Sequence, residues 1–302
     1  IAVGELFAQA SLRLLGLADI AANDVAAIGS HGQTIWHAPN GDKPFTLQIG
    51  DANIIAELTG ITTVSDFRSR DIAAGGQGAP LAPLLHQHQF ASTRASRAII
   101  NIGGISNITF LSPDIPAFAF DSGPGNVLMD GWIARHRGLN YDEKGSWARG
   151  GMVHKALLAK LQQDAYFSKG APKSTGRELF NSAWLETKLK SFNQPVKPID
   201  VQATLAQLTI QTLVNALKEH GEPEEIYVCG GGAHNSVLME GLANALATRT
   251  VSTTETLGIH PDWVEAIAFA WIAKQTMDGR AMETSAFTGA RAPVVLGAIY
   301  QR

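Results

Sequence analysis

The stretch from Arg97 to Asn126, RAIINIGGISNITFLSPDIPAFAFDSGPGN, decides the fold of this chain. An apolar strand over Ala98–Ile102 runs into Gly103-Gly104, and a return strand over Ile105–Leu111 completes a tight hairpin. Because glycine permits positive φ and close backbone approach, such a turn can direct N–H groups at an anion. An ordinary hairpin has the same pattern, so these residues alone leave a purely structural role open.

A second polar turn follows in the same stretch, after the apolar run Ala117–Phe120. It reads DSGPGN from Asp121 and leads into a helix expected from Val127. An aspartate at the end of a buried strand is held rigidly and faces the crevice in which open α/β sheets bind ligands. We therefore interpret Asp121 as a candidate functional residue, with a plain helix N-cap turn as the alternative.

Composition limits the class of protein. The 302 residues are 45% hydrophobic and 17% charged, as in a globular protein, and the length indicates two domains. With a net charge of −3 and no basic run, a nucleic-acid partner is not expected. The single cysteine, Cys229, excludes an intrachain disulfide framework and favours a cytoplasmic location. No apolar run reaches membrane-spanning length, so no membrane partner is expected.

Polar side chains follow three predicted strands in the first third of the chain. In chain order, Val25–Ile28 leads to His31 and Gln33, Phe45–Ile49 to Asp51, and Ile61–Val64 to Asp66 and Arg68. Asp51 also suits the N-cap of a helix through Leu58. The glycine-rich loop Ala73–Pro80 contains Gln77, and long loops in compact domains are often functional. We expect one α/β domain whose polar strand ends lie together.

A glycine run interrupts the second half of the chain. The strand Ile226–Cys229 ends at Gly230-Gly-Gly232, and a helix is expected over Ser236–Ala247. This arrangement suits a nucleotide, with flat backbone for a ring and a helix N-terminus for negative charge. Neither the fingerprint G-x-G-x-x-G nor the P-loop G-x-x-x-x-G-K-[ST] is present. Two long helices are also predicted, one capped by Asp200 and one over Pro261–Met277.

Other polar residues have weaker patterns. His86 and His88 are two apart in a helix-like segment, so their rings diverge and no shared metal is expected. Ser122 lacks the G-x-S-x-G elbow of a serine hydrolase. Glu265 lies among apolar residues of the last long helix, and its spacing leaves open a solvated position or a buried functional carboxylate.

Eight ordered motifs resemble those of the anhydro-N-acetylmuramic acid kinase family over essentially the whole chain. They are GSHGQTIWH from Gly29, TLQIGD from Thr46, SDFRSRDIAAGGQGAPL from Ser65, NIGGISNIT from Asn101, FDSGPGN from Phe120, KSTGRE from Lys173, VCGGGAHN from Val228 and VEAIAFAW from Val264. The family belongs to the sugar kinase, Hsp70 and actin superfamily. The resemblance implies a two-domain α/β, ribonuclease H-like fold with an interdomain cleft. We expect residues 1–96 and 279–302 in the first domain and residues 97–278, including a cleft-lining late helix, in the second.

The resemblance also implies a reaction. The family uses ATP, with Mg²⁺ bridging the phosphates, to phosphorylate 1,6-anhydro-N-acetylmuramic acid and to hydrolyse the anhydro ring in the same reaction. The product is N-acetylmuramic acid 6-phosphate, in the recycling of cell-wall peptidoglycan. The expected partners are therefore the sugar and ATP in the cytoplasm, and a homodimer is compatible with the family.

The resemblance carries roles over to individual residues. Asp121 matches the general base that activates water, and Glu265 matches a glutamate that contacts the sugar. Other sugar-side residues are placed at His31, Gln33, Asp66, Arg68 and Gln77, with Arg68 facing the lactyl carboxylate. The nucleotide is expected at Gly103, Gly104, Asn126, Gly230, Gly231 and Gly232, and no protein metal ligand is assigned.

The sequence departs from the family at its start. Family members carry an N-terminal glycine-rich hairpin, G-T-S-x-D-G, that binds ATP phosphates, and this sequence has nothing before Ile1. Because phosphoryl transfer depends on positioning, we expect a chain that starts at Ile1 to bind ATP poorly and to turn over little.

Two other classes of protein fit parts of the pattern. A non-catalytic nucleotide-binding module of the Hsp70 or actin kind would use the glycine turns but gives His31 and Arg68 no task. A glycoside hydrolase with Asp121 and Glu265 would need no ATP and would leave the turns at Gly103 and Gly230 unexplained.

Overall fold

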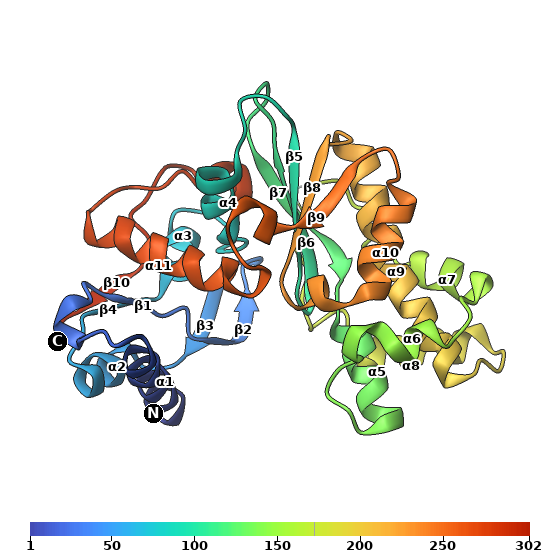
Figure 1. Ribbon diagram of the computed structural model, residues 1–302, viewed down its shortest axis with the longest axis horizontal. Helices are drawn as coiled ribbons and strands as arrows, with labels where there is room; N and C mark the ends of the chain where they lie inside the picture. Colours follow the sequence, from blue (N-terminus) through green and yellow to red (C-terminus); the bar gives the residue numbers. More distant parts are fainter. Residues whose placement is uncertain (172) are drawn as a thin grey trace. The chain divides into compact units, whose positions relative to one another are not determined.

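The predicted hairpin lies at the centre of a five-stranded sheet in the computed structural model, which describes residues 1–171 and 173–302. The chain divides into two units, each described here by itself (Figure 1). Unit 1 comprises Ile1–Gln89 and Glu265–Arg302, and unit 2 comprises Phe90–Val264. Both contain helices and strands, so the predicted α/β class is confirmed.

The sheet of unit 2 has the order β7-β6-β5-β8-β9. Its strands are β5 (Arg97–Ile102), β6 (Ile105–Leu111), β7 (Phe118–Pro124), β8 (Glu225–Cys229) and β9 (Thr250–Thr253). Strands β5, β6 and β7 pair antiparallel, whereas β8 pairs in parallel with β5 and β9 in parallel with β8. This is a mixed sheet of antiparallel and parallel strands. The parallel strands need crossover helices, and these supply the cover of the sheet.

Helices bury the apolar surface of this sheet. They are α5 (Val127–Arg137), α6 (Ser146–Arg149), α7 (Lys155–Gln162), α8 (Ser182–Phe192), α9 (Pro198–His220) and α10 (Ser236–Ala245). The longest of them, α9, packs against β7 and against α5, α6, α7 and α10, so it connects these helices to the sheet (Figure 1). Its leucines at 205, 208, 213 and 217 are almost wholly buried in one core with the sheet.

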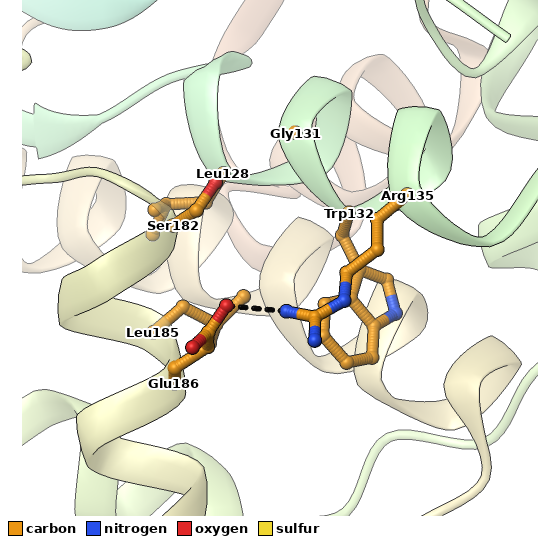
Figure 2. Close-up of a pocket in the computed structure, with 7 residues that line it drawn as sticks. All are labelled: Leu128, Gly131, Trp132, Arg135, Ser182, Leu185 and Glu186. Carbon is orange, nitrogen blue, oxygen red and sulfur yellow. Dashed lines mark hydrogen bonds and ion pairs between the residues drawn. The ribbon is translucent and has the colours of Figure 1, made fainter. Parts of the chain in front are cut away.

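The contact of α5 with α8 is close because a glycine lies in it (Figure 2). A Cβ on Gly131 would lie 3.2 Å from Ser182 Oγ, which leaves little room for any side chain. Leu128 and Leu185 are buried beside it, and an exposed ion pair joins Arg135 to Glu186 at the rim. The start of α8 is thereby fixed against α5.

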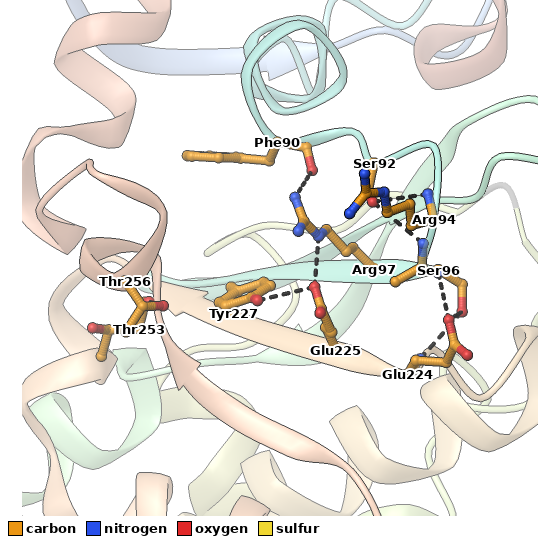
Figure 3. Close-up of polar contacts among 11 residues, drawn as sticks. Phe90, Ser92, Arg94, Ser96, Arg97, Glu224, Glu225, Tyr227, Thr253 and Thr256 are labelled. Atoms are coloured by element: carbon orange, nitrogen blue, oxygen red, sulfur yellow. Dashed lines mark hydrogen bonds and ion pairs between the residues drawn. The ribbon is translucent and has the colours of Figure 1, made fainter.

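A polar network ties the start of β5 to β8 (Figure 3). Arg97 Nε donates to Glu225 Oε2 at 2.7 Å, and Nη1 donates to the carbonyl of Phe90 at 2.9 Å. The guanidinium also lies over the ring of Tyr227, whose hydroxyl donates to the same carboxylate. The hydrogen bond from Arg97 lowers the pKa of Glu225 from its usual range. The chain therefore enters the central strand through a fixed anchor.

Unit 1 has two small sheets. A three-stranded sheet has the order β1-β4-β10, with β1 (Ile28–Gly29), β4 (Thr63–Ser65) and β10 (Ala298–Tyr300), and β2 (Gln33–Ala38) pairs with β3 (Phe45–Ile49). The helices are α1 (Ala2–Ala18), α2 (Ala52–Thr59), α3 (Phe67–Ala73), α4 (Ala82–Phe90), α11 (Val264–Met277) and α12 (Ser285–Thr288). As predicted, Asp51 caps α2 by accepting from the N–H of Asn53.

Helix α11 groups with unit 1, although the predicted boundaries place it in the second domain. The physical reason is packing. A Cβ on Gly29 would lie 2.5 Å from the carbonyl oxygen of Phe269, so only glycine lets the helix lie against β1. The ring of Phe269 lies beside Phe67 and His31, and Thr276 Oγ1 donates to the carbonyl of Leu296.

Two local predictions are wrong. Asp121 lies inside β7 and not at its end, because β7 continues to Pro124 in register with β6. Asp200 is not an N-cap, since α9 begins at Pro198 and the carboxylate of Asp200 instead accepts from the N–H of Met152 at 2.8 Å. Proline at the first helical position moved the start of this helix upstream.

A helix able to cross a bilayer is not found, since each helix in the described parts of the chain is too short or too polar for that.

Candidate active site

Asp121 is held on three sides by one segment of unit 2. Its carboxylate Oδ2 accepts from the N–H of Thr175 at 2.9 Å, and its own N–H donates to the carbonyl of Lys173 at 3.0 Å. The hydroxyl of Tyr166 donates to the carbonyl of Asp121 at 2.6 Å. A carboxylate held in this way keeps one orientation, which a general base requires.

The negative charge of Asp121 affects the pKa of the neighbouring Tyr166. Burial, together with the negative charge of Asp121, raises the pKa of the Tyr166 hydroxyl well above its usual range. Tyr166 therefore stays protonated and donates at all ordinary pH values. The ring of Tyr166 is buried against Phe180, whose centroid lies 5.4 Å away. The support of Asp121 is thus part of the core of unit 2.

The two predicted glycine turns of unit 2 differ in why they contain glycine. At Gly230, φ is +76° and a Cβ would lie 2.3 Å from Asn101 Oδ1, and a Cβ on Gly232 would lie 2.3 Å from Ile102 Cγ2. These glycines are required by the packing of the chain itself. At Gly103 and Gly104 neither φ is left-handed, contrary to what the hairpin pattern suggests, and a Cβ would meet nothing closer than 3.5 Å. The fold does not require glycine there, whereas a closely approaching ligand would.

A cavity of about 500 Å³ opens beside the second glycine turn. Its wall comes from α5, from the 3₁₀ turn at Glu143–Gly145 and from the turn after β8, with Asn126, Met129, Asp130, Tyr141, Asp142, Glu143, Lys144, Gly231, His234 and Asn235. Its volume and its mixed apolar and polar lining suit a small molecule. Sequence reasoning found Asn126 and Gly231 but missed the others, because their contact depends on how α5 packs.

Asp130 is a residue in the wall of this cavity whose pKa is shifted. Burial raises its pKa to about 6, with the charge of Asp142 adding to the rise and that of Arg177 opposing it. Asp142 itself is structural, since its two oxygens accept from the N–H groups of Trp147 and Ala148. Asp130 is half-buried because its helix turns it toward the cavity.

In unit 1, the structure brings His31 and Arg68 together. Arg68 Nε donates to His31 Nε2 at 2.8 Å, so this nitrogen has no proton and Nδ1 donates to the carbonyl of Gly32 at 2.8 Å. Burial, assisted by the charge of Arg68, lowers the pKa of His31 to about 4. A second bond from Arg68 Nη1 to the carbonyl of Gly78 fixes the guanidinium. A cation beside a neutral imidazole suits a polar, anionic substituent.

His37 also belongs to this group, because the charge of Arg68 acts on it. Its Nδ1 lies 3.0 Å from Thr46 Oγ1, and burial with the charge of Arg68 lowers its pKa to about 4. A bulge between Thr34 and Trp36 turns it to the polar face of the β2–β3 hairpin. The bulge shifts the alternation of side chains between the two faces of the strand by one residue, and only this shift could have revealed where His37 points.

The remaining predicted sugar-side residues are less closely joined. Asp66 has φ of +58° and accepts from Ser69, and Gln33 is exposed with its amide donating to the carbonyl of Thr34. The backbone of Gln77 donates to the carbonyl of Thr288 at 2.8 Å. Glu265 is exposed in the first turn of α11, which places it on the solvated side of that helix.

Comparison with known proteins identifies the family. The family model described as anhydro-N-acetylmuramic acid kinase matches residues 1–302. Kinases of that name from Coxiella burnetii, Aliivibrio fischeri and Photobacterium profundum are each 48% identical to the chain. In each case the match covers 99% of this chain and 81% of the relative.

Solved structures are more distant. The activator of the 2-hydroxyisocaproyl-CoA dehydratase from Clostridium difficile with bound ADPNP has a TM-score of 0.42 at 13% identity, covering 85% of this chain and 97% of that one. Component A of the Acidaminococcus fermentans (R)-2-hydroxyglutaryl-CoA dehydratase has a TM-score of 0.36 at 12% identity, with coverages of 71% and 78%. Such values add nothing to the assignment, which depends on the sequence matches: the chain belongs to the anhydro-N-acetylmuramic acid kinase family.

Proposed function

We propose that this kinase phosphorylates O6 of 1,6-anhydro-N-acetylmuramic acid with ATP and opens the anhydro ring in the same reaction. The products would be N-acetylmuramic acid 6-phosphate and ADP, in peptidoglycan recycling. The observation that carries the proposal is the carboxylate of Asp121, which accepts from the N–H of Thr175, on a backbone fixed by Lys173 and Tyr166 in the same unit as the two glycine turns. Because ATP is the donor, we place the reaction in the cytoplasm.

The steps follow from the chemistry of the ring. Asp121 takes a proton from water as the water oxygen bonds to the anomeric carbon, and the bond from that carbon to O6 breaks. O6 then bonds to the γ-phosphorus of ATP, and the bond from phosphorus to the bridging oxygen of ADP breaks. The electron pair released at O6 therefore becomes the nucleophile for phosphoryl transfer, and the proton of water remains on Asp121.

Unit 1 would recognise the sugar. Arg68 is fixed by His31 and by the carbonyl of Gly78, and its charge adds to the burial that lowers the pKa of His31 and His37. We assign the lactyl carboxylate of the sugar to this guanidinium, with neutral His31 oriented beside it. We propose His37 as a further polar contact of the sugar. Glu265, on the solvated side of α11, is proposed as another.

Unit 2 would hold the nucleotide. We place the phosphates at Gly103 and Gly104, where the fold leaves glycine unexplained, and the nucleoside in the cavity lined by Gly231 and Tyr141. Among the described residues no group of three acidic, histidine or cysteine side chains could hold a metal ion. A kinase Mg²⁺ needs only one or two carboxylates beside phosphate oxygens, and Asp130 would supply one. When bound, Mg²⁺ neutralises charge that develops on the phosphates.

A coupled assay with purified sugar tests the proposal. ADP formation that requires the anhydro sugar, with a product that has gained both a phosphoryl group and a water by mass, is the expected result. A product with the phosphoryl group and an intact ring would refute ring opening by this enzyme. Sugar hydrolysis without ATP would support a glycoside hydrolase instead.

A further inference from the structure

Arg177 lies beside the turn at Gly103 and Gly104, and its cationic side chain has no role in the site described above. A Cβ on Gly104 would lie 3.5 Å from Arg177 Nη2 and 3.6 Å from its Nε. The guanidinium therefore lies alongside the backbone that we propose for the phosphates. Its side chain is exposed, and in the part of the chain that the structure describes it forms neither an ion pair nor a side-chain hydrogen bond.

The backbone of Arg177 is fixed although its side chain is open. The carbonyl of Arg177 accepts from Asn181 Nδ2 at 3.0 Å, and Asn181 is the N-cap of α8. Phe180 is fully buried and anchors the same turn among the rings of Phe167 and Trp184. Because the backbone of Arg177 is fixed, its long cationic side chain can reach a ligand group at a defined position.

The charge of Arg177 reaches the carboxyl of Asp130, but no ion pair or hydrogen bond joins these two side chains in the part of the chain that the structure describes. The guanidinium is therefore available to a different anion.

The same loop also holds the candidate base. The N–H of Thr175 binds the carboxylate of Asp121, and Arg177 follows two residues later. We propose that Arg177 binds the transferring γ-phosphoryl group of ATP, an inference that depends on the proposed function. The loop from Lys173 to Glu178 then places the water-activating carboxylate and the phosphate-binding cation together. Five guanidinium donors in a planar fork match phosphate oxygens, and arginine is used in this way where phosphoryl charge develops.

Nucleotide binding tests this contact without turnover. With the purified protein, we compare wild type, Arg177→Ala, Arg177→Lys and the control Arg249→Gln, whose arginine pairs with Glu222. Calorimetry with β,γ-methylene ATP and with AMP is the measurement. We expect Arg177→Ala to weaken the triphosphate at least tenfold and to leave AMP within twofold. Equal loss for both nucleotides, or none for either, would overturn the inference.

Kinetics supply the second measurement. Arg177→Ala should lower kcat about a thousandfold, the scale of a lost phosphate-binding arginine. The KM for the sugar should stay within about threefold, and millimolar guanidinium should restore part of kcat. Arg177→Lys, which keeps the charge, should retain more activity than Arg177→Ala.

The outcomes separate this inference from the proposed function. If wild type phosphorylates the sugar, Asp121→Asn is inactive and Arg177→Ala keeps a normal kcat, the role of Arg177 is wrong and the proposed function stands. If wild type does not phosphorylate the sugar, the proposed function fails, and the triphosphate and AMP comparison still decides the contact. If Arg177→Ala does not fold, Arg177→Lys decides by the same two measurements, with unchanged triphosphate binding and unchanged kcat counting against the inference.

Discussion

Unit 1 and unit 2 hold their candidate functional groups by different means. In unit 2, Asp121 is fixed through backbone groups of Lys173 and Thr175 and through a tyrosine that stays protonated. In unit 1, a hydrogen bond joins the side chains of Arg68 and His31, and each side chain also bonds a backbone carbonyl. Backbone groups do not titrate, whereas an imidazole does. The comparison teaches that the support of Asp121 should be insensitive to mild acid, whereas the bond between Arg68 and His31 should be lost once His31 takes up a proton.

Replacing the base should have the largest effect. Asp121→Asn keeps the size of the side chain and an oxygen for the N–H of Thr175, but it cannot take a proton. We expect kcat to fall by about two to four orders of magnitude, with a much smaller change in sugar binding. Steady-state kinetics on the full-length enzyme, with ATP and sugar varied in turn, measure this. A near-normal kcat would show that another group activates the water.

The two glycine turns of unit 2 should respond oppositely to alanine. Gly230→Ala forces a Cβ against Asn101 at φ of +76°, ψ of 178°, so the free energy of unfolding should fall by about 1–3 kcal/mol. Gly104→Ala meets no atom closer than 3.5 Å and should leave stability unchanged, but it should weaken ATP binding. Urea denaturation and nucleotide calorimetry on both variants check this. A destabilised Gly104→Ala would mean that the fold itself needs this glycine.

Glu265 tests whether an exposed carboxylate on α11 serves the sugar. Because it is on the solvated side of its helix, Glu265→Gln should leave folding intact. If it mainly binds the sugar, its loss should raise KM at least as much as it lowers kcat. Steady-state kinetics with sugar as the varied substrate decide the matter, and an unchanged KM would remove Glu265 from the site.

Lowering the pH should gradually reduce the stability of unit 1. His31 and His37 have native pKa values of about 4, below the usual 6.5 that they recover on unfolding. Between these values the unfolded chain binds more protons, so the free energy of unfolding should fall as pH drops from about 6.5 to 4. Urea denaturation across this range measures the slope. The double variant with His31→Gln and His37→Gln should reduce the slope, with buried His86, whose pKa is about 3, retaining part of it, whereas His234→Gln should leave it unchanged.

Local patterns predicted much of the fold. The hairpin of β5 and β6, the strands β3 and β8 and the helix α2 lie where apolar periodicity and the cap at Asp51 put them. Element ends were less accurate, as Pro198 and the extension of β7 show. These errors are local because helix and strand ends are decided by single hydrogen bonds.

The sequence by itself determined the family, the α/β class and the residue types of the candidate site, because motifs and apolar spacing are written along the chain. Tertiary structure alone decided which residues meet. It placed α11 with unit 1 through the missing side chain of Gly29, turned Asp130 toward a cavity, added His37 through a bulge and laid Arg177 beside Gly104. The physical reason is that each of these contacts joins residues far apart in sequence through close packing, which no local pattern encodes.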